Sequence, residues 1–342
     1  MKILFQSRNH VLAYDGSVLF HNNDPIVIFS YLSWKFRFSR IRILSRLFRL
    51  EPRCATMLND DIVILAMSNR VFFINVAEKR ISKVILVPDG LSTPLNLTTF
   101  NDEYVYWGDY GMNRDFHPIN IYRIDKNGDV KVLYTFPANS IFHIHNILFD
   151  KWNERFFILT GDFGDNVGIY TADLNFTKVV PFLVGNEQYR AVQGMALKDG
   201  FLWATDAVLN KNHIYYVSYS EPGKVECLSE INGSVIYGCN ISEGLLLSTT
   251  VEPYPSSKSF LKTILDDRIA PGVVDRNVYL LHVDKNKKIS ILGKYKKDCL
   301  PMQLFQYGQI TFPYYDAGHY DTIQCNGMAI KKFDGKIIKL SL

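Results

Sequence analysis

Residues 104–109, YVYWGD, decide the fold, because the same pattern of apolar residues closed by a small or acidic pair recurs along the chain. Further copies are residues 156–162 (FFILTGD), 201–206 (FLWATD) and 245–250 (LLLSTT). The four copies end 53, 44 and 44 residues apart. A repeat of roughly 40–50 residues with several short apolar strands is typical of a β-propeller. We therefore predict an all-β protein with one propeller domain over residues 1–342.

Aligning the copies predicts blades of four antiparallel strands, A to D, counted outward from the axis. Seven blades are expected, and six if the N-terminal strands complete the last blade. Two insertions interrupt the period, residues 32–52 and residues 253–276. The first blade is expected within residues 3–31, and the later A strands at residues 53–58, 95–100, 142–147, 191–196, 235–240 and 301–306.

Composition agrees with a large sheet protein. The chain has 342 residues, 47% of them hydrophobic, and its 20 Tyr and 23 Phe favour strands. No apolar run reaches the ~18 residues of a membrane-spanning helix, and the apolar stretch at the N-terminus is too short for a secretory signal. We therefore expect a cytoplasmic protein. Its five scattered cysteines contain no CxxC, which predicts neither a disulfide framework nor a zinc site.

One segment carries the positive charge. The net charge of the chain is +4, whereas residues 34–53 hold seven basic residues against Glu51. Residues 41–50 predict an amphipathic helix with Arg42, Arg46 and Arg49 on one face. This helix could pack on the propeller with its basic face in solvent, or residues 34–50 could touch an anionic membrane peripherally. Nucleic acid is not expected as a partner, because the rest of the chain has no basic excess.

Polar residues gather where the propeller geometry places the mouth of the channel. The D-to-A and B-to-C loops open on one face, so the starts of A strands and the ends of B strands converge there. Carboxylates, histidines and an arginine on one rim are the groups that general acid–base chemistry requires. The A strands supply Asn96, His143, His145, Gln188, Arg190, Gln193, Tyr237 and Gln303, and the B strands supply Asp109, Asp162, Asp165, Asp206 and Glu252.

His143 and His145 are the most specific pair. Residues i and i+2 of a strand share a face, so both imidazoles should point the same way. One could act as a base, or both could bind a divalent metal together with Asp162. Alternatively, they are polar core residues bonded to backbone carbonyls.

The remaining candidates have structural alternatives too. Asp109, Asp162 and Asp206 could act as carboxylates of a site or bond the amides of their own turns. Arg190 could bind a carboxylate or sulfate in two-point fashion, or form a structural ion pair. Tyr237 could donate a proton or simply pack in the channel.

Several of these strings resemble a known family. They are HIHN from His143, TGD ending at Asp162, QYRA around Arg190, TD ending at Asp206, and Glu252 followed by Pro253. The chain resembles the sialidase-like (BNR-repeat) propellers associated with microbial surface-polysaccharide loci. It lacks the SxDxGxxW box and a clear arginine triad, so the resemblance implies the fold rather than sialidase activity.

The expected function is cleavage of an acidic, uronic-acid-type saccharide by a lyase or a glycoside hydrolase. Catalytic candidates are His143, His145, Tyr237, Asp162, Asp206 and Glu252, and substrate-binding candidates are Arg190, Gln188, Gln193, Asn96 and Asp109. The alternatives are a non-catalytic propeller that binds glycan or protein, and a metal-dependent esterase or lactonase. No cofactor is certain, and a divalent metal is possible, with His143, His145 and Asp162 as its candidate ligands.

Overall fold

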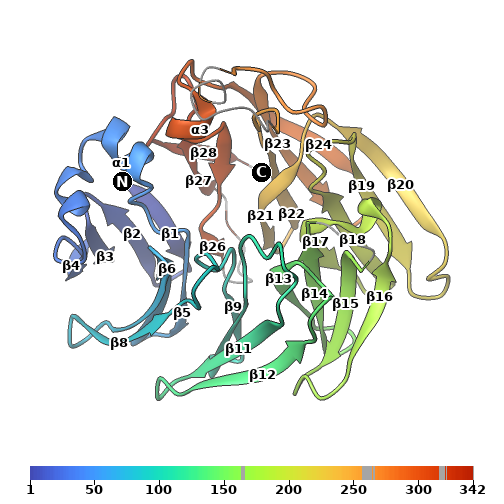
Figure 1. The fold of residues 1–342 in the computed structure, drawn as a ribbon, viewed down its shortest axis with the longest axis horizontal. Coiled ribbons are helices and arrows are strands. Elements are labelled where there is room, and N and C mark those ends of the chain that lie inside the picture. Colours follow the sequence, from blue (N-terminus) through green and yellow to red (C-terminus); the bar gives the residue numbers. More distant parts are fainter. Residues whose placement is uncertain (163–165, 256–263, 265, 316–319, 321, 342) are drawn as a thin grey trace.

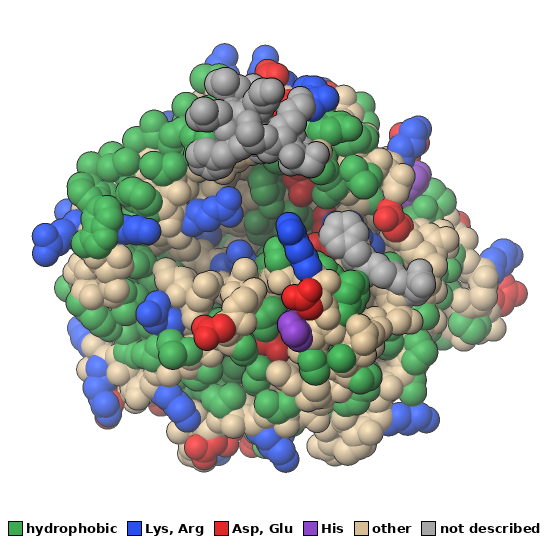
Figure 2. Space-filling model, viewed as in Figure 1, with side chains coloured by type: hydrophobic (Ala, Val, Ile, Leu, Met, Phe, Trp, Pro, Cys, Tyr) green, Lys and Arg blue, Asp and Glu red, His purple; other side chains and the backbone are tan. Residues whose placement is uncertain are grey.

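The computed structural model is a seven-bladed β-propeller whose sheets surround a central axis (Figure 1). It describes residues 1–162, 166–255, 264, 266–315, 320 and 322–341. Figure 2 shows that the viewed face is hollowed near its centre. The chain runs around the ring in order, and its strands are β1 Lys2–Gln6, β2 Val11–Asp15, β3 Val18–His21, β4 Asp24–Ile28, β5 Cys54–Asn59, β6 Ile62–Met67, β7 Arg70–Asn75, β8 Arg80–Leu86, β9 Thr98–Phe100, β10 Tyr104–Gly108, β11 Ile119–Asp125, β12 Val130–Phe136, β13 His143–Asp150, β14 Arg155–Gly161, β15 Gly168–Asp173, β16 Val179–Val184, β17 Ala191–Ala196, β18 Gly200–Thr205, β19 Asn212–Ser218, β20 Val225–Ile231, β21 Val235–Ile241, β22 Gly244–Thr249, β23 Asn277–Asp284, β24 Ile289–Lys296, β25 Gln309–Thr311, β26 Tyr314–Tyr315, β27 Thr322–Met328 and β28 Ile337–Ser341.

The repeated apolar copies are the second strands of their blades. Every residue of β18 and β22 is buried, and β14 is buried in all but its first residue. Strands of this kind are buried on both sheet faces, because each blade packs against a neighbour on either side. The outermost strands are far more exposed, as in β8. This gradient places the hydrophobic core between the blades and toward the axis.

The last blade differs from the sequence-based expectation. Residues 301–306 form no inner strand but contain a short helix, α3 Met302–Phe305. The apolar stretch that follows, residues 309–315, is divided into β25 and β26 around Pro313, whose nitrogen has no hydrogen to donate to a sheet. Among the described residues, this blade has three strands, β25, β27 and β28, and β26 pairs in parallel with β1 of the first blade. This pairing closes the ring.

Side-chain amides also join successive blades near the axis. Asn96 donates to the carbonyl of His145 over 3.0 Å, and Asn146 donates to that of Val192 over 3.0 Å. Gln193 continues the series by donating to the carbonyl of Ile236 over 3.1 Å. These bonds satisfy buried carbonyl groups and set the spacing of the inner strands.

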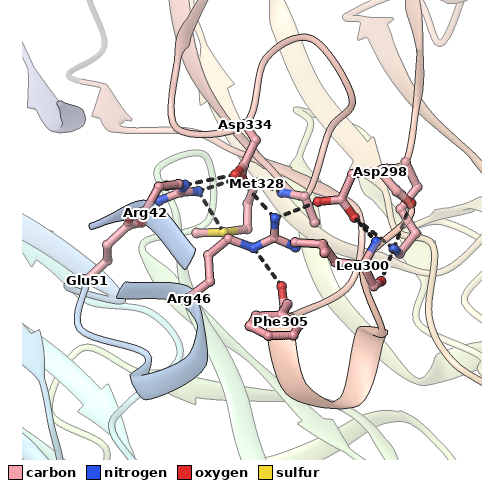
Figure 3. A network of polar contacts seen from close by, with 10 residues as sticks. Arg42, Arg46, Glu51, Asp298, Leu300, Phe305, Met328 and Asp334 are labelled. Atoms are coloured by element: carbon pink, nitrogen blue, oxygen red, sulfur yellow. Dashed lines mark hydrogen bonds and ion pairs between the residues drawn. The ribbon is translucent and has the colours of Figure 1, made fainter. Parts of the chain in front are cut away.

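The first insertion folds as a 3₁₀ helix, η1 Trp34–Phe38, followed by α1 Arg42–Phe48. The expected solvated basic face of α1 is wrong, because Arg46 is 2% exposed and Arg42 points into the protein as well. Arg46 Nη1 lies 2.5 Å from Asp298 and 3.2 Å from Asp334, and Arg42 Nη2 lies 2.7 Å from Asp334 (Figure 3). The acidic partners come from the last blade region, so the arginines anchor the helix there.

The structure has no described helix long and apolar enough to cross a membrane.

Candidate functional site: a polar ring at the channel mouth

The starts of A strands and the ends of B strands converge as expected. His143 and His145 stand at the start of β13, and Asp162 directly follows β14 of the same blade. The Nε2 atoms of His143 and His145 lie 3.6 Å and 3.2 Å from the Asp162 carboxylate. Gly161 allows this approach, because a Cβ at that position would collide with the His145 ring.

The two imidazoles differ in their protonation. Each Nδ1 faces a backbone carbonyl, that of Gly111 at 2.7 Å for His143 and that of Ala191 at 2.9 Å for His145. A carbonyl can only accept, so each Nδ1 carries a proton. Burial would lower the pKa of His145, but its hydrogen bond to Asp162 and the charge of that carboxylate outweigh burial and raise the pKa. Burial and the neighbouring His145 lower the pKa of His143 to about 4.

His143 is therefore a neutral imidazole at ordinary pH. Its buried Nε2 has no hydrogen-bond partner among the described residues. An unprotonated ring nitrogen with an available lone pair can accept a proton or bind a metal.

Arg190 links the histidine group to the next blade. Its Nη2 lies 3.0 Å from Asp162 Oδ1 and 3.7 Å from Asp206 Oδ2. Burial would raise the pKa of Asp162, but the hydrogen bond from His145 and the positive charges of His145 and Arg190 hold that pKa well below its usual range. Asp206 is buried more deeply and has a weaker contact with Arg190. Burial therefore raises its pKa despite that charge.

Glu252 is the second carboxyl group with a raised pKa. Its Oε2 accepts from the Thr250 hydroxyl at 3.2 Å, and no cation of the described residues lies within ion-pair distance of it. Burial, followed by repulsion from Asp206, raises the pKa of Glu252 to about 7. We call this cluster the polar ring; it comprises His143, His145, Asp162, Arg190, Asp206 and Glu252, and the neighbouring Arg53, Tyr110, Tyr237 and Tyr307. It combines a carboxylate of lowered pKa, Asp162, with two carboxyl groups of raised pKa, Asp206 and Glu252.

Tyr237 stands on β21 near the same group, since Arg53 and Glu252 both influence its pKa. Burial is the largest influence and raises that pKa. The phenol therefore keeps its proton at neutral pH and can donate it in a hydrogen bond.

Three residues of the ring were not among the sequence candidates. Arg53 precedes β5 and lies 5.0 Å from the centroid of the Tyr110 ring. Tyr110 follows β10, and its ring centroid is 4.7 Å from that of His143. Tyr307 precedes β25, close enough for Tyr237 and Glu252 to raise its pKa after burial. The same register rule could have found Arg53 and Tyr110, at the start of an A strand and the end of a B strand; Tyr307 was hidden by the mistaken strand at 301–306.

Arg53 differs from Arg190 in its partners. Its Nη1 donates to the carbonyl of Thr93 at 2.6 Å, and it makes no ion pair with a described carboxylate. Arg190 is already paired with two carboxylates. Arg53 is therefore the better placed guanidinium for binding the anionic group of a ligand.

Other sequence candidates lie outside the ring or contribute only structure. The amides of Asn96 and Gln193 join blades, as described above. Asp109 accepts from the backbone nitrogen of Asn120 at 2.9 Å, within its own blade. Gln188, in the short helix η2 Glu187–Tyr189, uses its carbonyl to accept from Trp203 at 2.8 Å. Gln303 belongs to α3, and Asp165 lies outside the described residues.

His143, His145 and Asp162 could together hold a metal ion, since their ligand atoms lie within 4.8 Å of one another. Asp162 Oδ1, however, already faces His145 and Arg190. A divalent ion would have to displace the proton of His145 and approach a fixed guanidinium. The arrangement therefore favours Arg190 as the cation that balances Asp162.

Comparisons with known proteins support the fold alone. No family model matches the sequence, and no curated protein matches it. A chain of a structure titled "Crystal Structure of Mitotic Checkpoint Complex" aligns with TM-score 0.55 and 8% identity, over 99% of this chain and 89% of its own. The WD40 β-propeller domain of Doa1 aligns with TM-score 0.48 and 11% identity over 82% and 75%. A putative TolB from Agrobacterium tumefaciens gives 0.42 and 10% over 70% and 79%. The resemblance to sialidase-like propellers stays a prediction.

Proposed function

We propose that this propeller is an enzyme that uses the polar ring for general acid–base cleavage of an acidic saccharide. One observation carries the proposal: the ring holds titratable groups whose pKa values are pushed apart. His143 is neutral, while Glu252, with a pKa of about 7, still holds its proton near neutral pH. Opposite shifts in one cluster are typical of acid–base pairs in active sites.

Elimination fits the ring better than hydrolysis. A glycoside hydrolase needs one carboxylate that is free to act as base or nucleophile. Asp162 is ionised, but its Oδ1 is engaged by His145 and Arg190, while Asp206 has a raised pKa. A lyase needs instead a proton acceptor, a proton donor and a positive group for the uronate carboxylate.

The proposed step assigns these roles to residues of the ring. Arg53 binds the carboxylate and stabilises the charge that develops when the neighbouring carbon loses its proton. His143 Nε2 accepts that proton, and Glu252 or Tyr237 donates one to the departing glycosidic oxygen. The bond between C4 and that oxygen breaks as a C4–C5 double bond forms, so the products are an unsaturated uronate and a free hydroxyl group.

The half-buried Tyr110, Tyr237 and Tyr307 support a saccharide ligand. Aromatic rings present an apolar face together with a hydroxyl group, which suits the mixed surface of a sugar.

The test is a screen of the purified chain against acidic and neutral polysaccharides, which follows unsaturated-uronate absorbance and reducing ends in parallel. Lyase activity gives both signals, and only with acidic chains. Reducing ends without absorbance would indicate hydrolysis. Neither signal, together with retained binding of an acidic glycan that Arg53→Ala abolishes, would contradict catalysis and favour the non-catalytic alternative.

A further inference from the structure

The segment that leads from the first blade to the second exposes large apolar side chains. The exposed fractions are 68% for Tyr31, 62% for Trp34, 49% for Ile41 and 45% for Ile43. Figure 2 shows hydrophobic side chains along the edge of the molecule occupied by η1 and α1 in Figure 1, with Lys and Arg side chains among them. We call these four residues the apolar edge.

The basic residues around the apolar edge are not matched by acids. Lys35, Arg37, Arg40 and Arg49 are exposed, and none makes an ion pair with a described residue. Arg42 and Arg46, by contrast, turn inward and are paired with acidic residues of the propeller. The segment thus divides its basic residues between anchoring and exposure.

Packing and ion pairs hold Trp34 and α1 of the apolar edge in place. Trp34 packs edge-on against Phe38 and Phe48, with ring centroids 6.0 Å apart in both cases. Phe36 and Leu50 are buried in the core of the first two blades, and ion pairs fix α1 from the other side. These contacts keep the exposed face of the Trp34 ring in solvent, so no rearrangement of the segment is needed before it meets a partner.

We infer that the apolar edge and its four basic residues form a docking surface for an anionic lipid bilayer. Trp and Tyr favour the boundary between headgroups and acyl chains, and aliphatic side chains can insert beneath them. Exposed Lys and Arg attract anionic headgroups. An acidic protein surface could match the charges, but a bilayer accommodates both the aromatic and the aliphatic side chains without a shaped partner.

Docking would orient the polar ring. The segment joins the outermost strand β4 to the innermost strand β5, and it ends at Arg53, a member of the ring. The docking surface and the ring therefore lie on the face where A strands begin. A docked molecule would hold the mouth of its channel toward the membrane surface.

The test is co-sedimentation of the full chain with vesicles of phosphatidylcholine, alone or with roughly one third phosphatidylserine. We expect binding to the anionic vesicles. This binding should be largely lost as salt rises from about 0.1 M to about 1 M, because screening then limits the attraction between charges to ~3 Å. The partition coefficient for anionic vesicles should fall about tenfold in Trp34→Ser. It should fall by a similar factor in the double variant Arg37→Glu, Arg49→Glu. Trp152→Ser is the matched control, because Trp152 is 49% exposed beside Lys151 but lies in a turn between β13 and β14, away from the segment.

Fluorescence gives a second measurement. In a Trp152→Phe background, the emission of Trp34 should shift to the blue when anionic vesicles are added, since Trp107 and Trp203 are buried. The proposal is overturned if wild-type protein stays in the supernatant with every vesicle. That result is expected if the docking surface binds a protein instead of a bilayer. Equal binding to neutral vesicles, or equal loss in Trp152→Ser, overturns the proposal as well.

Discussion

Arginines and carboxylates meet at two places in the molecule, around α1 and in the polar ring. The two groups differ in how completely their charges are paired. Around α1, three cations and three acids are matched at close range: Arg42 and Arg46 of the helix, together with Lys297, contact Glu51, Asp298 and Asp334. Burial would raise the pKa of Asp334, but bonding to Arg42 and its charge outweigh burial and lower the pKa. The same holds for Asp298 with Arg46 and Lys297.

In the channel ring, comparable groups are present but incompletely matched. The Asp162 carboxylate lies within ion-pair distance of both Arg190 and His145, whereas Glu252 accepts a hydrogen bond from the Thr250 hydroxyl group. The distance from a carboxylate to the nearest cation therefore decides the direction of its pKa shift. Close contact with a cation lowers the pKa, and burial without such a contact raises it. The close ion pairs of the α1 group hold that helix against the last blade, and we call this group the clamp. The incomplete pairing in the ring supports its proposed role in proton transfer.

The largest expected effect concerns the ring. Glu252→Gln removes one of the two proposed proton donors with almost no change of shape. If Glu252 rather than Tyr237 donates the proton, activity on an acidic saccharide should fall about 10²- to 10⁴-fold. The pH dependence of kcat/KM for wild-type protein should rise near pH 4, where His143 becomes neutral, and fall near pH 7, where Glu252 loses its proton. The variant should lose the upper limb. A variant that keeps the full rate and both limbs of the pH profile would show that Glu252 is not the proton donor.

Breaking the clamp should affect stability and not chemistry. Arg46→Ala removes the buried guanidinium that Asp298 and Asp334 share, and Lys297 and Arg42 remain as their other cations. The loss should be about 3 kcal/mol of unfolding free energy in urea titrations, at the low end for a broken buried pair. Arg49→Ala is the control on the same segment, because Arg49 is exposed and unpaired among the described residues; it should stay within ~0.5 kcal/mol. Equal stability of the two variants would contradict the clamp.

The retained proton of Glu252 should also appear in the pH dependence of stability. Its folded pKa, about 7, lies above the unfolded value of 4.5, so its protonated form favours the native state. This contribution is present below pH 4.5 and is lost as pH rises to 7. Glu252→Gln lacks the effect, so its unfolding free energy relative to wild type should increase by up to about 3 kcal/mol over that interval. A constant difference would show that Glu252 ionises normally.

The smallest effect tests the blade-joining amides. Asn96→Ala removes one bond to the His145 carbonyl and should cost about 1 kcal/mol of unfolding free energy. Because the amide is used within the protein, KM for an acidic saccharide should not change. A clear rise in KM at unchanged stability would restore Asn96 as a substrate-binding residue.

Much of the fold and part of the site followed from the chain alone. The period located the apolar strands, and the strand register brought His143, His145, Asp162 and Arg190 together before any contact was known. The register failed at 301–306, where an apolar stretch of strand-like composition forms α3 instead. It also did not show that the amides of Asn96 and Gln193 bond carbonyls of the next blade, because register places a residue at the axis but does not say which neighbouring carbonyl its amide meets.

The sequence determined the repeat, because a blade must bury apolar strands at a regular spacing wherever it stands in the ring. Only the tertiary structure decided how the charges pair, because that depends on distances between groups up to hundreds of residues apart, such as Arg42 and Asp334. A helical pattern suggested that Arg46 faces water, and acids of the last blade draw it inward instead. Among the described residues, the same distances leave Glu252 without a cation at ion-pair distance, and burial raises its pKa to about 7.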